Sequence, residues 1–139
     1  MAKQTGLGDY LAVDDSGGTA RDISDNVVSY DANLVQNLIE ATSLSKSTVE
    51  RIPGINDGTF PISGVADFAS NKSHDVFKTR TGVRTFDLRI GGNTSSNPRL
   101  QVECRVASYN LSRGADGALN WTAELMVSDG AAIAYDTVP

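Results

Sequence analysis

The sequence of 139 residues is poor in the residue types from which catalytic and metal sites are built. It has one cysteine, one histidine and one tryptophan, and its 12 lysines and arginines are outnumbered by 17 acidic residues. The single cysteine, Cys104, excludes an internal disulfide framework and any metal site made from several cysteines. The net charge of −5 disfavours sequence-independent DNA binding, because such binding needs surplus basic side chains to displace counterions from the phosphates.

Long hydrophobic runs are missing as well. The N-terminal residues contain no apolar stretch of the length that a signal peptide or a membrane-spanning helix requires. A composition of 40% hydrophobic and 21% charged residues is typical of a globular protein, and the chain length fits one domain. We therefore expect a single domain over residues 1–139 that folds in a cytoplasm-like compartment and has no membrane partner.

The C-terminal half alternates apolar and polar residues with a period of two, which is typical of an antiparallel strand with one solvated face. This pattern predicts strands over residues 83–90, 99–109 and 120–128. The segment 112–118 between the last two contains an Asp-Gly step, and both residue types tolerate the positive φ of hairpin turns. We therefore predict that the last two strands form a β-hairpin.

The N-terminal half has a less regular pattern. Shorter strands are predicted over residues 10–13 and 22–30, separated by a polar, Gly-containing turn at 14–18. A further strand is expected over residues 59–68. Pro61 within it has no amide hydrogen to donate to a sheet ladder, so we expect Pro61 at a sheet edge or at a bulge.

Two segments depart from the strand pattern. Residues 73–80 are predicted to form a short helix with Ser73 as its N-cap. The segment 31–42 fits either an amphipathic helix that begins at Asp31 or a strand toward its end, and the pattern leaves both open. The polar segment 43–58 is predicted to be a long loop. These elements indicate a mainly β fold, an antiparallel β-sandwich or barrel with one or two short helices.

No segment of the sequence predicts an active site. His74 is expected to be an exposed residue near the start of the short helix, since its neighbours cannot form a catalytic triad with it. Cys104 and Trp121 fall on apolar strand faces and are predicted to be core side chains. The acidic residues between positions 14 and 25 lack the spacing of a calcium loop. We therefore expect no catalytic, cofactor-binding or metal-binding residues.

Three phrases of the sequence resemble one family of proteins. They are MAKQTGLGDY at residues 1–10, VERIPGINDGTFPISG at 49–64 and YNLSRGADGAL at 109–119. Together, and in this order, they resemble the major tail tube proteins of long-tailed bacteriophages. The resemblance extends from residue 1 to about residue 128.

The resemblance implies a structural role. Tail tube proteins resemble a β-sandwich that closes through sheet pairing between subunits into hexameric rings with a central channel. The rings stack around a tape measure protein, and genomic DNA later passes through the channel without specific binding. The implied partners are further copies of the chain, the tape measure protein, the tail terminator, and distal tail or baseplate proteins. The implied location is the virion tail, assembled in the host cytoplasm, and no cofactor is implied.

Three alternative functions remain open. A type VI secretion tube protein is similar in fold to the tail tube proteins and is the closer alternative. A monomeric ligand-binding β-domain would need an exposed aromatic platform, for which a buried Trp121 would be unsuitable. An enzyme would need a catalytic constellation that the sequence does not reveal.

The expected contacts between subunits lie in the parts of the chain that are free to reach neighbours. These parts are an N-terminal arm of about residues 1–9, a long loop of about 43–58 and a C-terminal extension of about 129–139. The candidate contact residues are Leu7, Asp9, Arg51 and Asp57.

The channel wall has to let DNA pass, so we expect acidic side chains on a solvated strand face to line it. Glu103 and Glu124 are the first candidates, because pairing of their strands in a hairpin would place them on one face. Asp87 and Asp67 are further candidates, and Arg89 and Arg105 are basic exceptions on the same kind of face. The alternative, in which this face lies on the exterior of a tube, stays open.

Overall fold

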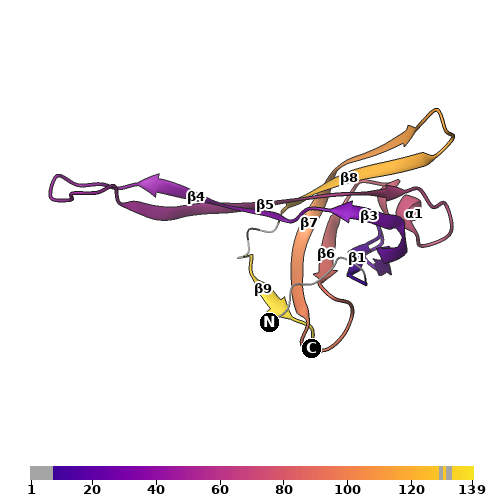
Figure 1. Ribbon diagram of the computed structural model, residues 1–139, viewed down its shortest axis with the longest axis horizontal. Coiled ribbons are helices and arrows are strands. Elements are labelled where there is room, and N and C mark those ends of the chain that lie inside the picture. Colours follow the sequence, from indigo (N-terminus) through magenta and orange to yellow (C-terminus); the bar gives the residue numbers. More distant parts are fainter. Residues whose placement is uncertain (1–7, 129, 131–132) are drawn as a thin grey trace.

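The computed structural model describes residues 8–128, 130 and 133–139, and in these residues nine antiparallel strands form one sheet (Figure 1). The elements in chain order are β1 (Tyr10–Asp14), β2 (Ala20–Asp22), the 3-10 turn η1 (Ser24–Asn26), β3 (Val27–Tyr30), β4 (Asn33–Glu40), β5 (Arg51–Val65), α1 (Ser73–Phe77), β6 (Val83–Arg89), β7 (Pro98–Arg113), β8 (Leu119–Val127) and β9 (Tyr135–Thr137). The mainly β fold with a short helix is therefore confirmed.

The order of the strands across the sheet is β2-β1-β6-β7-β8-β5-β3. Strands β6, β7 and β8 follow one another as antiparallel neighbours, which confirms the three strands and the hairpin predicted in the C-terminal half. Strand β4 pairs with the first half of β5, and β9 pairs with the beginning of β7. Residues 135–137 of the expected C-terminal extension are thus a strand of the chain's own sheet.

One face of the sheet forms the hydrophobic core. Phe60, Phe86, Leu100 and Leu125, from four different strands, are fully buried there, and Cys104 lies among them as predicted. Because side chains alternate along a strand, the opposite face carries the polar residues of the same strands. We call this opposite face the outer face.

Trp121 is also buried in the core, as its strand pattern predicts. Its indole Nε1 donates to the backbone oxygens of Asn26, at 3.2 Å, and Val65, at 3.1 Å. The ring of Phe77 from α1 packs against the indole, with the ring centres 5.3 Å apart. Trp121 therefore joins β8 to the ends of η1 and β5 and to the helix.

The short helix α1 is confirmed, but it ends at Phe77, before the predicted boundary. The prediction that Ser73 is its N-cap is wrong. Lys72 occupies the cap position without a side-chain bond, and the Ser73 hydroxyl instead accepts a hydrogen bond from the amide of Asp67 at 3.3 Å. A buried Ser73 thus holds the turn between β5 and α1.

Pro61 lies inside the sheet, so the expectation of an edge or bulge at this residue is wrong. Strand β5 has β8 on one side, and the register with β8 runs through Pro61 without a shift. On the other side, the carbonyl of Pro61 accepts from the amide of Asp31 at 2.9 Å. Asp31 lies between the end of β3 and the start of β4. The nitrogen of Pro61, which has no hydrogen to donate, therefore faces the gap between β3 and β4.

The prediction of a loop over 43–58 is wrong from Arg51 onward. Residues 51–58 are the first half of β5, and they pair with β4, which resolves the open choice for residues 31–42 in favour of a strand. Only residues 41–50 form a loop between the two strands. We call residues 33–58 the arm. Figure 1 shows the arm extending far beyond the remaining sheet, which we call the body.

No helix in the described residues is long and apolar enough to cross a membrane.

Candidate functional site

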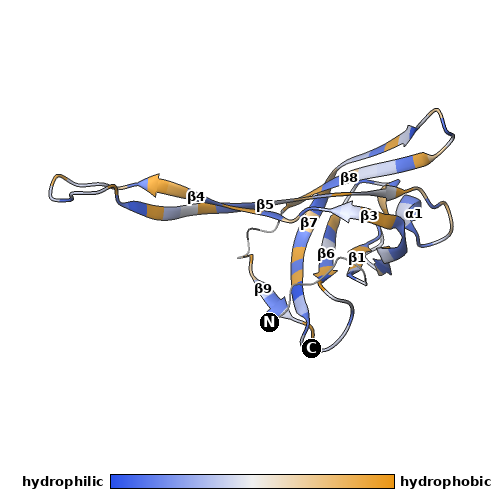
Figure 2. Cartoon of the chain, in the orientation of Figure 1, coloured by the Kyte–Doolittle hydropathy of each residue, from blue (hydrophilic) through white to orange (hydrophobic). Residues whose placement is uncertain are grey.

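The arm is the most unusual surface of the molecule. Figure 2 shows hydrophobic stretches along β4 although this strand lies outside the body. All eight of its residues are exposed to solvent. More than half of the large hydrophobic side chains that are exposed in the described residues belong to the arm, namely Leu34, Val35, Leu38, Ile39, Leu44, Val49, Ile52 and Ile55. Contiguous exposed apolar surface of this kind is typical of an interaction site.

The arm is held to the body only at its base. There, Gly58 is buried and lies opposite Leu34 in the β4–β5 ladder. A side chain at position 58 would come within 2.9 Å of Val127 and 3.3 Å of Leu34, so these two side chains close over the glycine. Beyond the base, the arm is a two-stranded ribbon with two open edges. Ribbons of two strands are marginally stable in water unless something packs on them.

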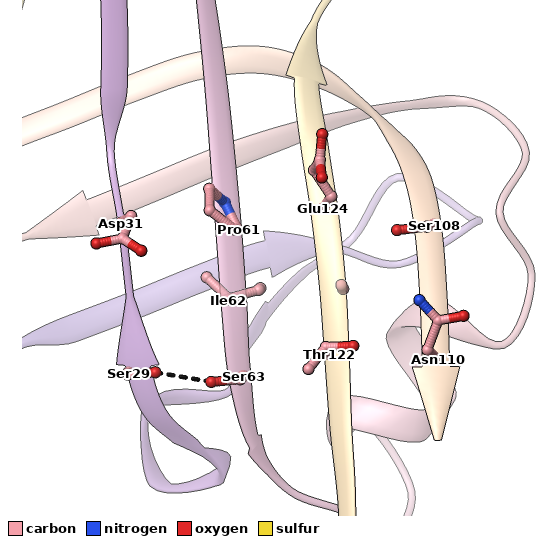
Figure 3. Close-up of a pocket in the computed structure, with 10 residues that line it drawn as sticks. Ser29, Asp31, Pro61, Ile62, Ser63, Ser108, Asn110, Thr122 and Glu124 are labelled. Atoms are coloured by element: carbon pink, nitrogen blue, oxygen red, sulfur yellow. Dashed lines mark hydrogen bonds between the residues drawn. The ribbon is translucent and has the colours of Figure 1, made fainter. Parts of the chain in front are cut away.

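A shallow polar groove of about 320 Å³ crosses the outer face of the body (Figure 3). Its polar side chains come from β3, β5, β7, β8 and the link between β3 and β4, and they are Ser29, Asp31, Ser63, Ser108, Asn110, Thr122 and Glu124. Two of the hydroxyls, on Ser29 and Ser63, are hydrogen-bonded at 2.7 Å across the β3–β5 pair. No lysine or arginine is among the described residues that line the groove. Its surface therefore offers hydroxyls, amides and carboxylates but no cation to a phosphate.

Glu103 and Glu124 lie on the same face of the sheet, as the sequence predicts. Arg105 pairs with Met126, and after a register shift Ser108 pairs with Glu124, so the outward positions of β7 and β8 stay matched. The two carboxylates are nevertheless apart, because Glu103 and Ser108 are five positions apart on β7, or roughly 16 Å along the strand. Only Glu124 borders the groove.

Glu103 has a different neighbourhood. Its Oε1 accepts a hydrogen bond from the hydroxyl of Thr85 at 2.7 Å across the β6–β7 pair. Asp87 is next along the same outer face of β6, but it is only 8% exposed and pairs with Arg89 at 2.9 Å. The Asp87 carboxylate is thus engaged with an arginine and largely withdrawn from solvent.

The expectation that Asp67 lies on a solvated strand face is wrong. Strand β5 ends at Val65, and Asp67 belongs to the turn that follows. Its two carboxylate oxygens accept from the amide of Ala69 at 3.0 Å and from the side chain of Asn26 at 3.2 Å. Asp67 therefore shapes the turn before α1.

The four predicted contact residues fall in three places. Leu7 lies outside the described residues. Asp9 bridges two segments of its own chain, because its carboxylate accepts from the Tyr30 hydroxyl at 2.6 Å and from the Gly91 amide at 2.8 Å. Burial, together with the bond to Asp9, raises the pKa of Tyr30. Arg51 and Asp57 are exposed on the arm.

His74 is half-buried, which corrects the expectation of an exposed residue. Its Nδ1 lies 3.1 Å from the hydroxyl of Tyr109, and its ring packs against Phe68. Burial raises the pKa of the Tyr109 hydroxyl. Among the described residues, no group of three or more histidine, cysteine and acidic side chains could hold a metal ion.

Sequence reasoning missed the apolar surface of the arm and the groove. A signal for the arm is present in the sequence, because Leu34-Val35 and Leu38-Ile39 are adjacent apolar pairs. In a strand, neighbouring side chains point to opposite faces, so such pairs make both faces apolar. The groove has no comparable signal, since it depends on a register shift between Val106 and Ser108.

No protein-family model matches this sequence, and no curated protein is similar to it in sequence. Solved structures do share its fold. One is a chain from the tail of an empty gene transfer agent (GTA) particle, refined with helical and C6 symmetry. It superposes with a TM-score of 0.74 at 16% identity, over 96% of this chain and 99% of the other.

Two further structures agree with this one. A chain from the virion of the native gene transfer agent has a TM-score of 0.73 at 15% identity and covers 96% of this chain and 99% of its own length. A chain from the six-fold symmetrised baseplate of the anti-feeding prophage (AFP) has a TM-score of 0.65 at 9% identity and covers 99% and 98%. The fold implied by the resemblance to tail tube proteins is therefore confirmed.

Proposed function

We propose that this chain is a structural subunit of a phage-like tail tube, located in the virion tail and without catalytic activity. The observation that carries the proposal is a fold shared over nearly its whole length with chains of gene transfer agent tails and virions. The three sequence phrases that resemble tail tube proteins support the same role independently.

The subunits form hexameric rings that stack into a tube. The exposed arm supports this part of the proposal, because a projecting apolar ribbon is unfavourable on a monomer and useful in a polymer. Open strand edges support it too, since pairing between subunits removes edges that would otherwise promote aggregation. Arg51 and Asp57 on the arm are the proposed charged contacts with a neighbouring copy or with the next ring.

The channel conducts DNA past the groove on the outer face. A wall with Glu124 and Asp31 and without a basic side chain repels or ignores phosphates, as a conduit requires. Of the four candidate lumen residues, Glu124 fits best, because Asp87 is paired and buried and Asp67 lies in a turn. Glu103 lies away from the groove along β7.

The remaining partners follow from this role. A tail tube subunit surrounds a tape measure protein and joins a tail terminator at one end and distal tail or baseplate proteins at the other. Assembly takes place in the host cytoplasm. The second candidate is a subunit of a secretion-type tube, which the likeness to a chain of the anti-feeding prophage baseplate favours.

Assembly of the purified protein tests the proposal. Native mass spectrometry and negative-stain electron microscopy over a range of concentrations are expected to show hexamers, six-fold rings or tubes. A chain that remains monomeric at all concentrations would contradict the proposed function.

A shortened arm loop tests the contribution of the arm. Deleting residues 45–48 from the loop is expected to leave the body folded, as judged by circular dichroism, and to abolish tube growth. The control Lys46→Ser keeps the loop length and is expected to assemble, since the Lys46–Glu50 contact of 3.8 Å is solvent-exposed. Normal tubes from the deletion variant would remove the loop at the tip of the arm from the proposed contacts.

A further inference from the structure

The groove on the outer face is built from two rows of side chains that cross the sheet. In the first row, Pro61 lies opposite Glu124, and Glu124 lies opposite Ser108. Asp31 continues this row on the other side of Pro61, since its amide donates to the carbonyl of Pro61 at 2.9 Å. The second row lies beside the first and consists of Ser29, Ser63, Thr122 and Asn110. Both rows belong to one chain, so the groove is complete without a second copy.

The first row has a negative charge on each side of an apolar residue. Figure 3 shows Pro61 between Asp31 and Glu124. Two strand spacings separate the backbones of the two acidic residues, which is roughly 10 Å. Neither carboxylate has a hydrogen-bond or ion-pair partner among the described residues. The nearest cation in the pairing scheme, Arg105, lies opposite Met126 and forms no salt bridge in the described part of the chain. The two carboxylates are therefore free to bind a ligand.

The composition of the groove disfavours two common classes of ligand. A phosphate would meet two carboxylates and, within the described lining, no basic side chain. A calcium or magnesium ion needs several oxygens within about 2.6 Å of one point. The two acidic residues are instead two strands apart, and the described residues contain no group of side chains able to hold a metal ion. Charge complementarity therefore favours a cation whose charges are as widely separated as the carboxylates.

A linear aliphatic polyamine has this distribution of charge. Each of its primary ammonium groups offers three hydrogen-bond donors and no acceptor, like the side chain of lysine. The groove supplies acceptors in the carboxylates of Asp31 and Glu124 and in the hydroxyls of Ser63 and Thr122. The methylene chain between two ammonium groups would lie against the ring of Pro61, which has no polar atom to leave unpaired. The volume of about 320 Å³ is within the range of small-molecule sites.

We infer that the groove binds a linear aliphatic polyamine, with one ammonium group on Asp31, another on Glu124 and the methylene chain across Pro61. The hydroxyls of the second row accept further hydrogen bonds from the ammonium groups. The site is open to solvent, so each ion pair contributes modestly and the affinity depends on both pairs forming together. The inference goes beyond the proposed function, since it requires neither a ring nor DNA.

Isothermal titration calorimetry with three cations tests the inference. Putrescine is a diamine with an ammonium group at each end, butylamine has the same carbon chain with one ammonium group, and Mg²⁺ has the charge of putrescine at a single point. All three are titrated into the full chain at low and equal ionic strength, because salt screens exposed charges. We expect putrescine to bind at one site per chain and at least tenfold more tightly than butylamine or Mg²⁺.

Neutral variants of the two carboxylates locate the site. Asp31→Asn and Glu124→Gln each remove one charge at nearly constant shape and are expected to weaken putrescine binding at least fivefold. The control Glu103→Gln makes the same charge change on the same face of the sheet, away from the groove, and is expected to bind putrescine as wild type does. In nuclear magnetic resonance spectra of the dilute chain, putrescine should shift the amide resonances of Ser63 and Thr122.

Each other outcome overturns the inference. Equal affinity for putrescine and butylamine would show that only one carboxylate takes part, and equal affinity for putrescine and Mg²⁺ would show attraction by charge alone. Equal weakening by Glu103→Gln and Glu124→Gln would place binding outside the groove, and no measurable binding of putrescine would leave the groove without this ligand. These results leave the proposed function standing, whereas a chain that binds putrescine and never assembles would overturn the proposed function alone.

Discussion

The guanidinium of Arg84 donates a hydrogen bond to the backbone oxygen of Val76, with Nη1 2.7 Å from that oxygen. Arg84 is fully buried and donates further bonds to the carbonyl oxygens of Asp14, Thr79 and Thr81. No carboxylate forms a salt bridge with it among the described residues. Burial lowers the pKa of this arginine. The side chain thus joins β6 to the end of β1, to α1 and to the segment that follows α1.

Replacing this arginine is expected to destabilise the body strongly. Arg84→Met leaves several buried carbonyl oxygens without a donor, and each such group costs about 1–3 kcal/mol. We expect the free energy of unfolding to fall by about 3 kcal/mol or more, measured by urea denaturation. Arg84→Lys should be almost as damaging, because an ammonium cannot reproduce the planar fork of donors.

The matched control is Arg113→Met. Arg113 lies on the exposed β7–β8 hairpin, and its side chain donates to the backbone oxygen of Gly117. Its replacement is expected to change stability by no more than about 0.5 kcal/mol. Equal effects of the two methionine variants would show that the buried network does not contribute as described.

A methyl group at Gly64 is expected to separate β3 from β5. A Cβ atom there would lie 1.8 Å from the backbone oxygen of Asn26, which also accepts the indole hydrogen of Trp121. Gly64→Ala should therefore lower stability by about 3 kcal/mol and shift the fluorescence of the single tryptophan to longer wavelength. Gly17→Ala is the control, since a Cβ atom there meets only the Asp15 side chain at 3.4 Å.

The attachment of β9 is expected to depend on pH. Arg99 donates two hydrogen bonds to Asp136, at 2.9 and 2.8 Å, and these bonds lower the pKa of the Asp136 carboxyl. The pair therefore contributes stability above the ordinary aspartate pKa of about 3.9 and loses it as the pH falls through the lower folded value. The amide resonances of Thr137 and Val138 should move toward random-coil positions below about pH 4. In Asp136→Asn this pH dependence should disappear.

The strands with one solvated face could be predicted from the sequence, because their period of two reflects burial on the core side alone. Strand β4 could not be distinguished from a helix. Its apolar residues at i, i+1, i+4 and i+5 form a helical stripe. In a strand the same residues fall on both faces, and a strand with exposed apolar side chains on both faces lacks the alternation by which strands are recognised. Residues 51–58, rich in Gly, Pro, Asn and Asp, have the composition of a loop and become a strand by pairing with β4.

The candidate site depended on features with no local signal. The groove around Glu124 requires the register shift that places Ser108 opposite Glu124. A one-residue bulge of this kind needs no particular residue type, so the sequence gives no sign of it. Pro61 suggested a sheet edge because the sequence does not reveal that the neighbouring strand breaks opposite the proline. The separation of Glu103 from Glu124 follows mainly from the length of β7, because Glu103 lies five positions from Ser108, the residue opposite Glu124.

The backbone of the arm is expected to be much less protected from hydrogen exchange than the body in the monomer. A two-stranded ribbon opens locally because few apolar contacts hold it. Amides of β4 should show protection factors at least about a hundredfold lower than amides of β7, a central strand that pairs with β6 and β8. Assembly should remove most of this difference, as measured by hydrogen–deuterium exchange with mass spectrometry. An arm as protected as the body in the monomer would contradict the prediction.

The last prediction concerns the wall of the channel. In the proposed hexameric ring, Glu124→Lys would place six cations beside the groove, and each new ion pair between a lysine and a phosphate would strengthen DNA binding in a salt-dependent way. Particles built with this variant should assemble but release DNA more slowly than wild type at low salt and recover at high salt. Glu103→Lys is the matched control, because it makes the same charge change on the same sheet face, away from the groove, and should leave the release rate nearly unchanged. If Glu124→Lys particles release DNA at the wild-type rate at low salt, the groove is not part of the channel wall. If only Glu103→Lys particles release DNA slowly, the outer surface of β6 and β7 lines the channel instead.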